Sequence, residues 1–295
     1  MLNRIKFSLI LSILTIVLCL SLGELFVRYF KTPLYPKDNE LGWIFPHQER
    51  KGSGNKKILV IGDSFTQARG IVEDRTYYAS FLPFASDLQV YGIGAYGTYQ
   101  EYLLLKRVLQ HFSPDIVLWQ FSPNDFINNI PELERQFHST LHTTDRPFYL
   151  GNEKSKFGYE LFRDLKMIHF LSFSRLFMFL YEQWQMRHLE PPALSPEEAV
   201  RKSNSLEITS TILKKVRETL PSNAQLYFFT TETSLGLKDE FNHLIQANGL
   251  QIIPVAERLI EEKNKGKNIL SDDHYHWNEL GHQIVGNEIL KFIRE

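Results

Sequence analysis

The hydrophobic pattern of the chain begins with one long apolar run near the N-terminus. Residues 7–23 are almost all apolar, and two basic residues precede them. A helix that crosses a membrane needs about 20 mostly apolar residues, and this run reaches that length if Glu24 lies at the interface. No small-residue cleavage site follows the run. We therefore predict an uncleaved transmembrane signal anchor over residues 1–31, with a cleaved signal peptide as the alternative.

Five shorter apolar runs, rich in β-branched and aromatic residues, alternate with segments of helical periodicity. The runs cover residues 56–61, 88–91, 115–121, 225–230 and 251–255, and the helical segments cover residues 98–111, 197–219 and 278–293. Strands that alternate with helices form a parallel sheet with helices on both faces. The pattern therefore predicts an α/β fold, in which a site forms beyond the carboxyl ends of the strands.

The stretch from about residue 126 to 196 interrupts this alternation. Within it lies a segment rich in aromatic side chains, among them Phe170, Phe173, Phe177, Phe179, Tyr181 and Trp184. One interpretation is a helical insertion that packs on the core. The other is a lid or a membrane-facing surface beside a cleft that binds an acyl chain.

Composition limits the class of protein and its division into domains. The chain has 295 residues, of which 43% are hydrophobic and 23% charged, as in an ordinary globular protein. Its net charge of -1 does not fit the basic surface of a nucleic-acid binder, so we expect no nucleic-acid partner. Residues 32–55 are rich in proline, glycine and charge, and we predict a linker there. One domain is expected over residues 56–295.

Polar residues follow two of the predicted strands. The sequence Gly62-Asp63-Ser64 ends the first strand, and Ser122-Pro123-Asn124-Asp125 ends the third. A serine becomes a nucleophile when a base lies beside it, and an asparagine amide can donate to an oxyanion. Ordinary turns with a serine cap or an Asn-Asp pair are the alternatives.

A glycine-rich turn follows the second predicted strand. Its sequence, Gly92-Ile93-Gly94-Ala95-Tyr96-Gly97, matches the pattern of a dinucleotide-binding loop. That interpretation needs an acidic residue at the end of the next strand, whereas Asp115 begins that strand. The alternative is that one glycine, Gly97 in our prediction, brings a backbone N–H close to a substrate.

The densest cluster of ionisable groups lies between Asp272 and His282. Asp273 and His276 are three residues apart just before a helix, and on a turn this spacing can bring the carboxylate to the imidazole. A metal site is an alternative, but no second segment offers ligands, so no metal is predicted. A solvated helix start with an acidic cap is the other alternative. We interpret His274 and His282 as surface or packing residues.

Together these segments resemble the sequence blocks of the SGNH/GDSL hydrolase family. The resemblance covers residues 56–295, and it departs from the family pattern at Ser122, where a glycine is usual. It implies a three-layer α/β/α sandwich with a flavodoxin-like parallel sheet. It also implies Ser64 as nucleophile, Asp273 and His276 as its triad partners, and an oxyanion hole formed by Ser64, Gly97 and Asn124.

The resemblance further implies a serine hydrolase that cleaves an ester (O-acyl) bond through an acyl-enzyme, without a cofactor. The substrate would be a small-molecule, glycan or lipid acyl ester. An envelope polysaccharide O-acyltransferase or deacetylase, and a non-enzymatic interaction protein, are the alternatives. We expect a single-pass membrane protein with its catalytic domain on the extracytoplasmic side, or a secreted protein if the signal is cleaved.

Overall fold

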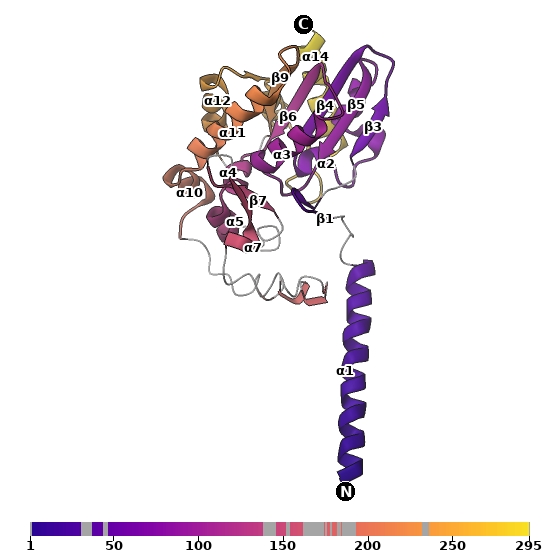
Figure 1. Cartoon of the computed structure of the whole chain (residues 1–295). Coiled ribbons are helices and arrows are strands. Elements are labelled where there is room, and N and C mark those ends of the chain that lie inside the picture. Colours follow the sequence, from indigo (N-terminus) through magenta and orange to yellow (C-terminus); the bar gives the residue numbers. More distant parts are fainter. Residues whose placement is uncertain are drawn as a thin grey trace.

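An α/β body and a separate N-terminal helix make up the molecule (Figure 1). The computed structural model describes residues 2–30, 37–43, 47–137, 146–151, 154–161, 174, 176–177, 179–181, 184, 193–231 and 236–294.

The body is built on a six-stranded sheet with the strand order β10-β9-β6-β4-β5-β3. Its strands are β3 (Gln48–Lys51), β4 (Lys56–Gly62), β5 (Ala85–Gly92), β6 (Ile116–Phe121), β9 (Gln225–Thr230) and β10 (Gln251–Ile252). All neighbouring strands pair in parallel except β3, which is antiparallel to β5. The five parallel strands therefore have the flavodoxin-like order, in which β4 is the first strand and lies between β5 and β6.

Helices cover both faces of the sheet. They are α2 (Ser64–Gln67), η1 (Glu73–Arg75), η2 (Tyr77–Phe81), α3 (Thr98–Val108), α4 (Asp125–Asn128), α5 (Pro131–Phe137), α7 (Gly158–Leu161), α10 (Pro196–Lys202), α11 (Ser205–Thr219), α12 (Lys238–Ala247), α13 (Val255–Asn264) and α14 (Glu279–Arg294). Leu59 and Ile61 of β4 pack in one apolar core with α3, α11 and α12. Ile58 and Val60 point to the opposite face and pack with η2, α13 and α14. Alternate residues of a strand point to opposite faces, so the two cores confirm the predicted three-layer sandwich.

The predicted linker is more ordered than its composition indicated. Strands β1 (Lys37–Asp38) and β2 (Gly42–Trp43) form a small hairpin, and β3 belongs to the main sheet. Leu41 is buried, and its carbonyl accepts a hydrogen bond of 2.9 Å from the Tyr96 hydroxyl. The linker prediction is corrected for these residues, because an edge strand needs no continuous apolar run to join a sheet.

The described part of the stretch 126–196 contains a hairpin as well as helices. Strands β7 (Pro147–Tyr149) and β8 (Ser155–Phe157) pair antiparallel. Tyr149 and Leu133 pack in the same core as α3, so this part covers the body. Phe170 and Phe173 of the aromatic segment lie outside the described residues.

The N-terminal helix α1 (Leu2–Phe30) projects away from the body (Figure 1). Its stretch Ile10–Tyr29 has a mean hydropathy of 2.4, and within the described chain it is the one helix long and apolar enough to cross a membrane. A signal sequence has the same properties.

Candidate active site

The local geometry around Ser64 follows from Gly62 and Asp63. A Cβ atom on Gly62 would lie 2.3 Å from Thr66 Oγ1 and 2.5 Å from Gln120 Oε1, so only glycine fits at the end of β4. Asp63 is buried and caps α2, because its Oδ1 accepts a hydrogen bond of 3.0 Å from the Phe65 N–H. Ser64 therefore begins α2 directly beyond the carboxyl end of a central strand.

A compact loop between α13 and α14 brings Asp273 and His276 to the same edge of the sheet. Leu270 and Trp277 form an isolated antiparallel bridge at its base. Inside the loop, the Ser271 N–H donates to the His276 carbonyl at 2.8 Å. The Asn278 side chain donates from Nδ2 to the carbonyls of Asn268 and Leu270, both at 3.0 Å. These bonds fix the start of α14 and the residues that precede it.

Ser64, His276 and Asp273 form a continuous chain of hydrogen bonds. His276 Nε2 lies 2.8 Å from Ser64 Oγ, and His276 Nδ1 lies 2.6 Å from Asp273 Oδ2. The other oxygen of Asp273 accepts the backbone N–H groups of Tyr275 and His276, each at 2.9 Å. The carboxylate thus holds the imidazole with its second nitrogen facing the serine hydroxyl.

The hydrogen bonds keep Asp273 ionised. Partial burial raises the pKa of this carboxyl group, but the bonds from the His276 ring and from the two backbone N–H groups outweigh it. The net effect lowers the pKa of Asp273 from 3.8 to about 2. The carboxylate accepts the hydrogen bond at Nδ1 and orients the ring, so that Nε2 faces Ser64 Oγ.

The aromatic side chain of Phe65 packs against the imidazole of His276. The buried Phe65 ring lies 4.9 Å from the His276 ring, and it also contacts the rings of Tyr275 and Trp277 at 5.2 and 4.8 Å. Since Phe65 directly follows Ser64, the same short helix positions both the hydroxyl and the ring that faces it.

The Asn124 side chain lies beside this group and is held at both ends. Tyr275 donates its hydroxyl to Asn124 Oδ1 at 3.3 Å, and Asn124 Nδ2 donates to Asn128 Oδ1 at 2.7 Å. The Asn124 side chain also interacts with the buried Asp63 carboxyl group and acts to lower its pKa, against the larger effect of burial, which raises it. Asn128 in turn donates to Glu134. Glu134 forms a fully buried ion pair with Arg146 at 2.6 Å.

The glycine-rich turn presents Gly94, and not Gly97, to Ser64. The Gly97 N–H is buried and donates to Gln100 Oε1 at 2.8 Å, which satisfies the first turn of α3. A Cβ atom on Gly94 would lie 3.6 Å from Ser64 Cβ, so this residue borders the serine. Within the described residues, neither the Gly94 N–H nor the Ser64 N–H has a hydrogen-bond partner. We therefore propose that Gly94, in place of Gly97, donates the backbone N–H to the oxyanion.

The serine that departs from the family pattern has its own contacts. Ser122 is buried, and its hydroxyl lies 3.3 Å from Thr231 Oγ1 at the end of β9. Its carbonyl accepts the Asp125 N–H at 2.8 Å, which closes the turn that carries Asn124. A serine side chain therefore fits at this position.

The other two histidines of the cluster differ in environment. His274 is exposed, whereas His282 is buried between Tyr77 and Trp277. The described part of the chain holds no group of three or more His, Cys, Asp or Glu side chains that could bind a metal ion.

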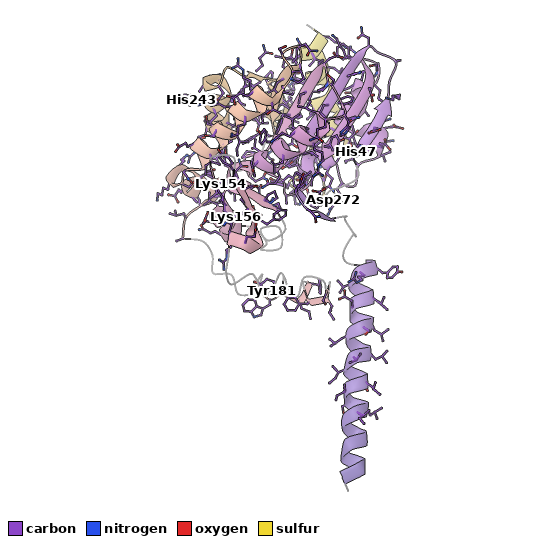
Figure 2. All side chains as sticks on the ribbon, in the orientation of Figure 1. His47, Lys154, Lys156, Tyr181, His243 and Asp272 are labelled. Carbon is purple, nitrogen blue, oxygen red and sulfur yellow. The ribbon has the colours of Figure 1, made fainter. Side chains whose placement is uncertain are left out.

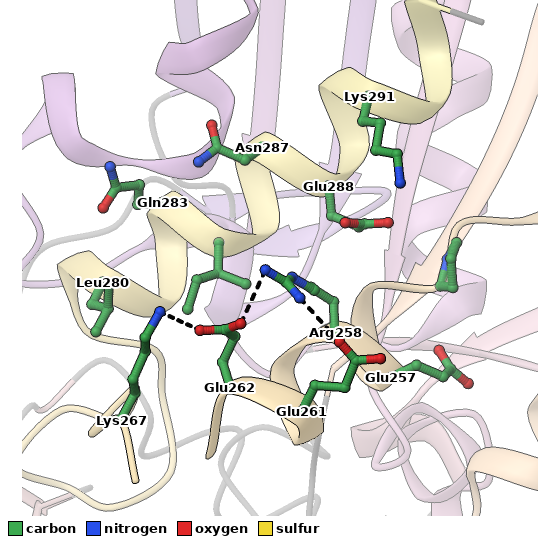
Figure 3. A pocket seen from close by; sticks show the side chains of 12 residues that line it. Glu257, Arg258, Glu261, Glu262, Lys267, Leu280, Gln283, Asn287, Glu288 and Lys291 are labelled. Carbon is green, nitrogen blue, oxygen red and sulfur yellow. Dashed lines mark hydrogen bonds and ion pairs between the residues drawn. The ribbon is translucent and has the colours of Figure 1, made fainter. Parts of the chain in front are cut away.

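A separate groove lies between α13 and α14 (Figure 3). Its charged side chains neutralise one another, because Glu262 accepts bonds from Arg258 at 3.0 Å and from Lys265 at 2.8 Å, and also pairs with Lys267. None of the residues around Ser64 lines this groove.

Comparison with known proteins gives similar solved structures. No protein-family model matches this chain, and no curated protein matches it. It is similar to a member of the lipolytic G-D-S-L family from Veillonella parvula, with 12% identity, a TM-score of 0.42, and coverage of 81% of this chain and 98% of that one. It is also similar to a catalytic mutant of an acetylxylan esterase from Geobacillus stearothermophilus, with 11% identity, a TM-score of 0.43, and coverage of 82% and 95%. A family 3 carbohydrate esterase from Clostridium thermocellum is 13% identical with a TM-score of 0.40, and the match covers 80% of this chain and 94% of that one.

Proposed function

We propose that this protein is a membrane-anchored serine hydrolase that cleaves an ester bond in an O-acylated substrate. The observation that supports it is the hydrogen-bonded series from Asp273 through His276 to Ser64, with distances of 2.6 and 2.8 Å. Serine is a weak nucleophile until a base removes its proton, and a base oriented by a carboxylate is the arrangement that achieves this.

In the proposed reaction, Ser64 Oγ attacks the ester carbonyl while His276 Nε2 takes the hydroxyl proton. The oxyanion that forms is stabilised by the N–H groups of Ser64 and Gly94 and by Asn124 Nδ2. Collapse of this intermediate breaks the ester bond, and His276 returns the proton to the departing alcohol. Water then attacks the acyl-enzyme while His276 takes one of its protons; the bond from Ser64 Oγ to the acyl group breaks, His276 returns the proton to Ser64 Oγ, and the carboxylic acid is released.

The partial exposure of the site supports an external substrate. Ser64, Gly94, Asn124 and His276 are all half-buried, so an acyl group can reach the hydroxyl. Acetylated glycans and other acyl esters are the proposed substrate class. We further propose that α1 anchors the enzyme, with the body on the extracytoplasmic side.

The test is labelling of the full-length protein in detergent with a fluorophosphonate probe, together with release of nitrophenol from nitrophenyl acetate. We expect Ser64→Ala to lose both labelling and hydrolysis, while Ser53→Ala, which changes an exposed serine in a surface turn, retains both. Equal labelling of wild type and Ser64→Ala would refute the assignment of the nucleophile. A folded wild type that neither labels nor hydrolyses would favour a non-enzymatic interaction protein.

A further inference from the structure

A short aromatic segment lies between the α/β body and α1. We define the aromatic segment as the described residues 174, 176–177, 179–181 and 184, of which residues 176 onward are helical. The ring centroids of Phe177 and Tyr181 are 6.2 Å apart, and those of Tyr181 and Trp184 are 6.0 Å apart. These residues recur at spacings of four and three, so their rings line one side of the helix.

The start of the aromatic segment is attached to α1 through Glu24. Glu24 Oε2 accepts the Ser174 hydroxyl at 2.9 Å and the Leu176 N–H at 2.8 Å. The Ser174 oxygen in turn accepts the Phe177 N–H at 3.1 Å. The first N–H groups of a helix lack partners within it, so Ser174 and Glu24 together satisfy two of them, and the carboxylate faces the positive end of the helix.

The attachment point lies near the end of the apolar span. Glu24 falls within the last turns of Ile10–Tyr29, and its other oxygen pairs with Arg28 at 2.7 Å. The backbone of Gly23 approaches closely, because a Cβ there would lie 3.0 Å from the Leu176 side chain. The contact therefore places the aromatic segment at the level where α1 would leave the hydrocarbon core.

The aromatic segment also has the orientation and side chains of a helix in a membrane surface. It runs crosswise to α1 at the end nearest the body, and Figure 2 shows Tyr181 in this position. Leu180 and Trp184 are each 55% exposed. Tyrosine and tryptophan are enriched where a bilayer meets water, and an amphipathic helix lies in that plane with its apolar face in the lipid.

Positive charge on the body lies on the same side as the aromatic segment. Lys154 and Lys156 extend from the β7–β8 hairpin, and both are exposed. Figure 2 places them on the side of the body from which α1 projects. Lysines close to an anionic lipid surface are attracted to it.

We propose that the aromatic segment lies in the interface of the bilayer that α1 crosses, and that lipid covers Leu180 and Trp184. The enzyme then has two membrane contacts, a spanning helix and an interfacial one, joined through Glu24. The body is held close to the lipid surface and does not swing freely on a tether. This inference rests on the proposed insertion of α1.

The test uses the full chain reconstituted in vesicles of phosphatidylcholine and phosphatidylglycerol. Tryptophan emission is compared between lipids brominated close to the headgroup and lipids brominated near the end of the acyl chain. We expect the headgroup-proximal bromine to cause the greater loss of emission, and we expect this loss to disappear in Trp184→Phe. Trp119 and Trp277 are fully buried in the body and provide an internal reference.

Extraction of the same vesicles with alkaline carbonate separates the two proposals. Protein that resists extraction and shows the loss of emission at Trp184 supports the inference. Protein that resists extraction but whose Trp184 emission does not respond to either bromine would overturn it, and would place this side chain against protein. Release of the chain by carbonate would overturn the anchor and the inference together.

Discussion

Single side chains around Asn124 form a relay from the site into the body. The Asn124 amide donates a hydrogen bond to Asn128 Oδ1. The Asn128 amide in turn donates to Glu134, which forms a buried ion pair with Arg146. Removal of either partner of a buried ion pair leaves an uncompensated charge and costs about 3–5 kcal/mol, so Glu134 is held next to Arg146. The relay therefore fixes the orientation of the Asn124 amide.

We predict that Asn128→Ala lowers kcat about tenfold with little change in KM. This loss should be smaller than the roughly 100–1000-fold loss expected when an oxyanion donor itself is removed, as in Asn124→Ala. Steady-state hydrolysis of nitrophenyl acetate measures both. Asn287→Ala, which changes an exposed asparagine on α14, is the matched control and should leave kcat unchanged.

The positioning role has a sharper check in the double variant. If Asn128 acts only through Asn124, then adding Asn128→Ala to Asn124→Ala should cause no further decrease in kcat. Losses that multiply in the double variant would show that Asn128 acts on its own, and would contradict the relay.

Residues close in sequence were easier to assign than residues brought together by folding. The spacing of Asp273 and His276 on a turn was visible in the sequence. The sequence did not show whether Gly94 or Gly97 has its N–H group available for a ligand. The difference depends on the Gln100 side chain, which accepts a hydrogen bond from the Gly97 N–H. Likewise, nothing in the sequence linked Asn124, which precedes α4, to Arg146, which precedes β7.

Among the elements, α14 and η2 pack closely on the face of the sheet that contains Phe65. A Cβ on Gly286 would lie 2.6 Å from the Tyr77 carbonyl, so the helix backbone lies directly against η2. His282 stacks on the Tyr77 ring with centroids 5.8 Å apart, and its Nδ1 accepts the Tyr77 N–H at 3.3 Å. This contact joins α14, the helix that follows His276 in the chain, to the rest of the body.

The packing makes the stability of the fold depend on pH through His282. Burial, with a smaller contribution from His276, lowers the pKa of His282 from 6.5 to about 4. As the pH falls, His282 therefore binds a proton in the unfolded chain before it does so in the folded chain. The free energy of unfolding decreases progressively from about pH 6.5 to about pH 4 for this reason. The difference between the two pKa values corresponds to a decrease of about 3 kcal/mol in the free energy of unfolding.

Urea unfolding at several pH values measures this loss. We expect His282→Gln, whose amide oxygen can still accept the Tyr77 N–H, to show a smaller decrease in unfolding free energy between pH 6.5 and 4. His274→Gln changes an exposed histidine and should follow the wild type. Parallel pH curves for wild type and His282→Gln would exclude His282 as the source.

Strand prediction succeeded where burial is two-sided and failed where it is not. The strands β4, β6 and β9 are rich in buried apolar residues, which is the signature of a central parallel strand. Strand β3 has the sequence Gln-Glu-Arg-Lys and alternates between half-buried and exposed positions. Its pairing with β5 is set by the rest of the sheet, so its own residues gave no signal.

At the scale of the whole molecule, the two cores of the body lie entirely between Leu41 and Ile289. Helix α1 adds no residue to either core, and most of its described side chains are exposed. The body should therefore fold without α1, and the apolar stretch of α1 should determine whether the protein stays in the membrane.

We predict that a chain starting at residue 37 keeps its fluorophosphonate labelling but is released from membranes by alkaline carbonate. The full chain should remain in the membrane pellet under the same treatment. Immunoblotting of pellet and supernatant distinguishes the two. A shortened product of the full-length gene in the supernatant would indicate a cleaved signal sequence in place of an anchor.

The charged edge strand has a consequence for a protein anchored in a membrane plane, as proposed above. Neighbouring copies there collide repeatedly, and an open sheet edge could recruit a strand from another copy and start aggregation. Strand β3 closes one edge with side chains that are already paired, Lys51 with Asp87 at 2.5 Å and Arg50 with Asp74 at 2.7 Å. Strand β10 offers only two residues at the other edge. Charged and very short edge strands both discourage such recruitment, so copies anchored through α1 as proposed can be crowded without their sheets joining.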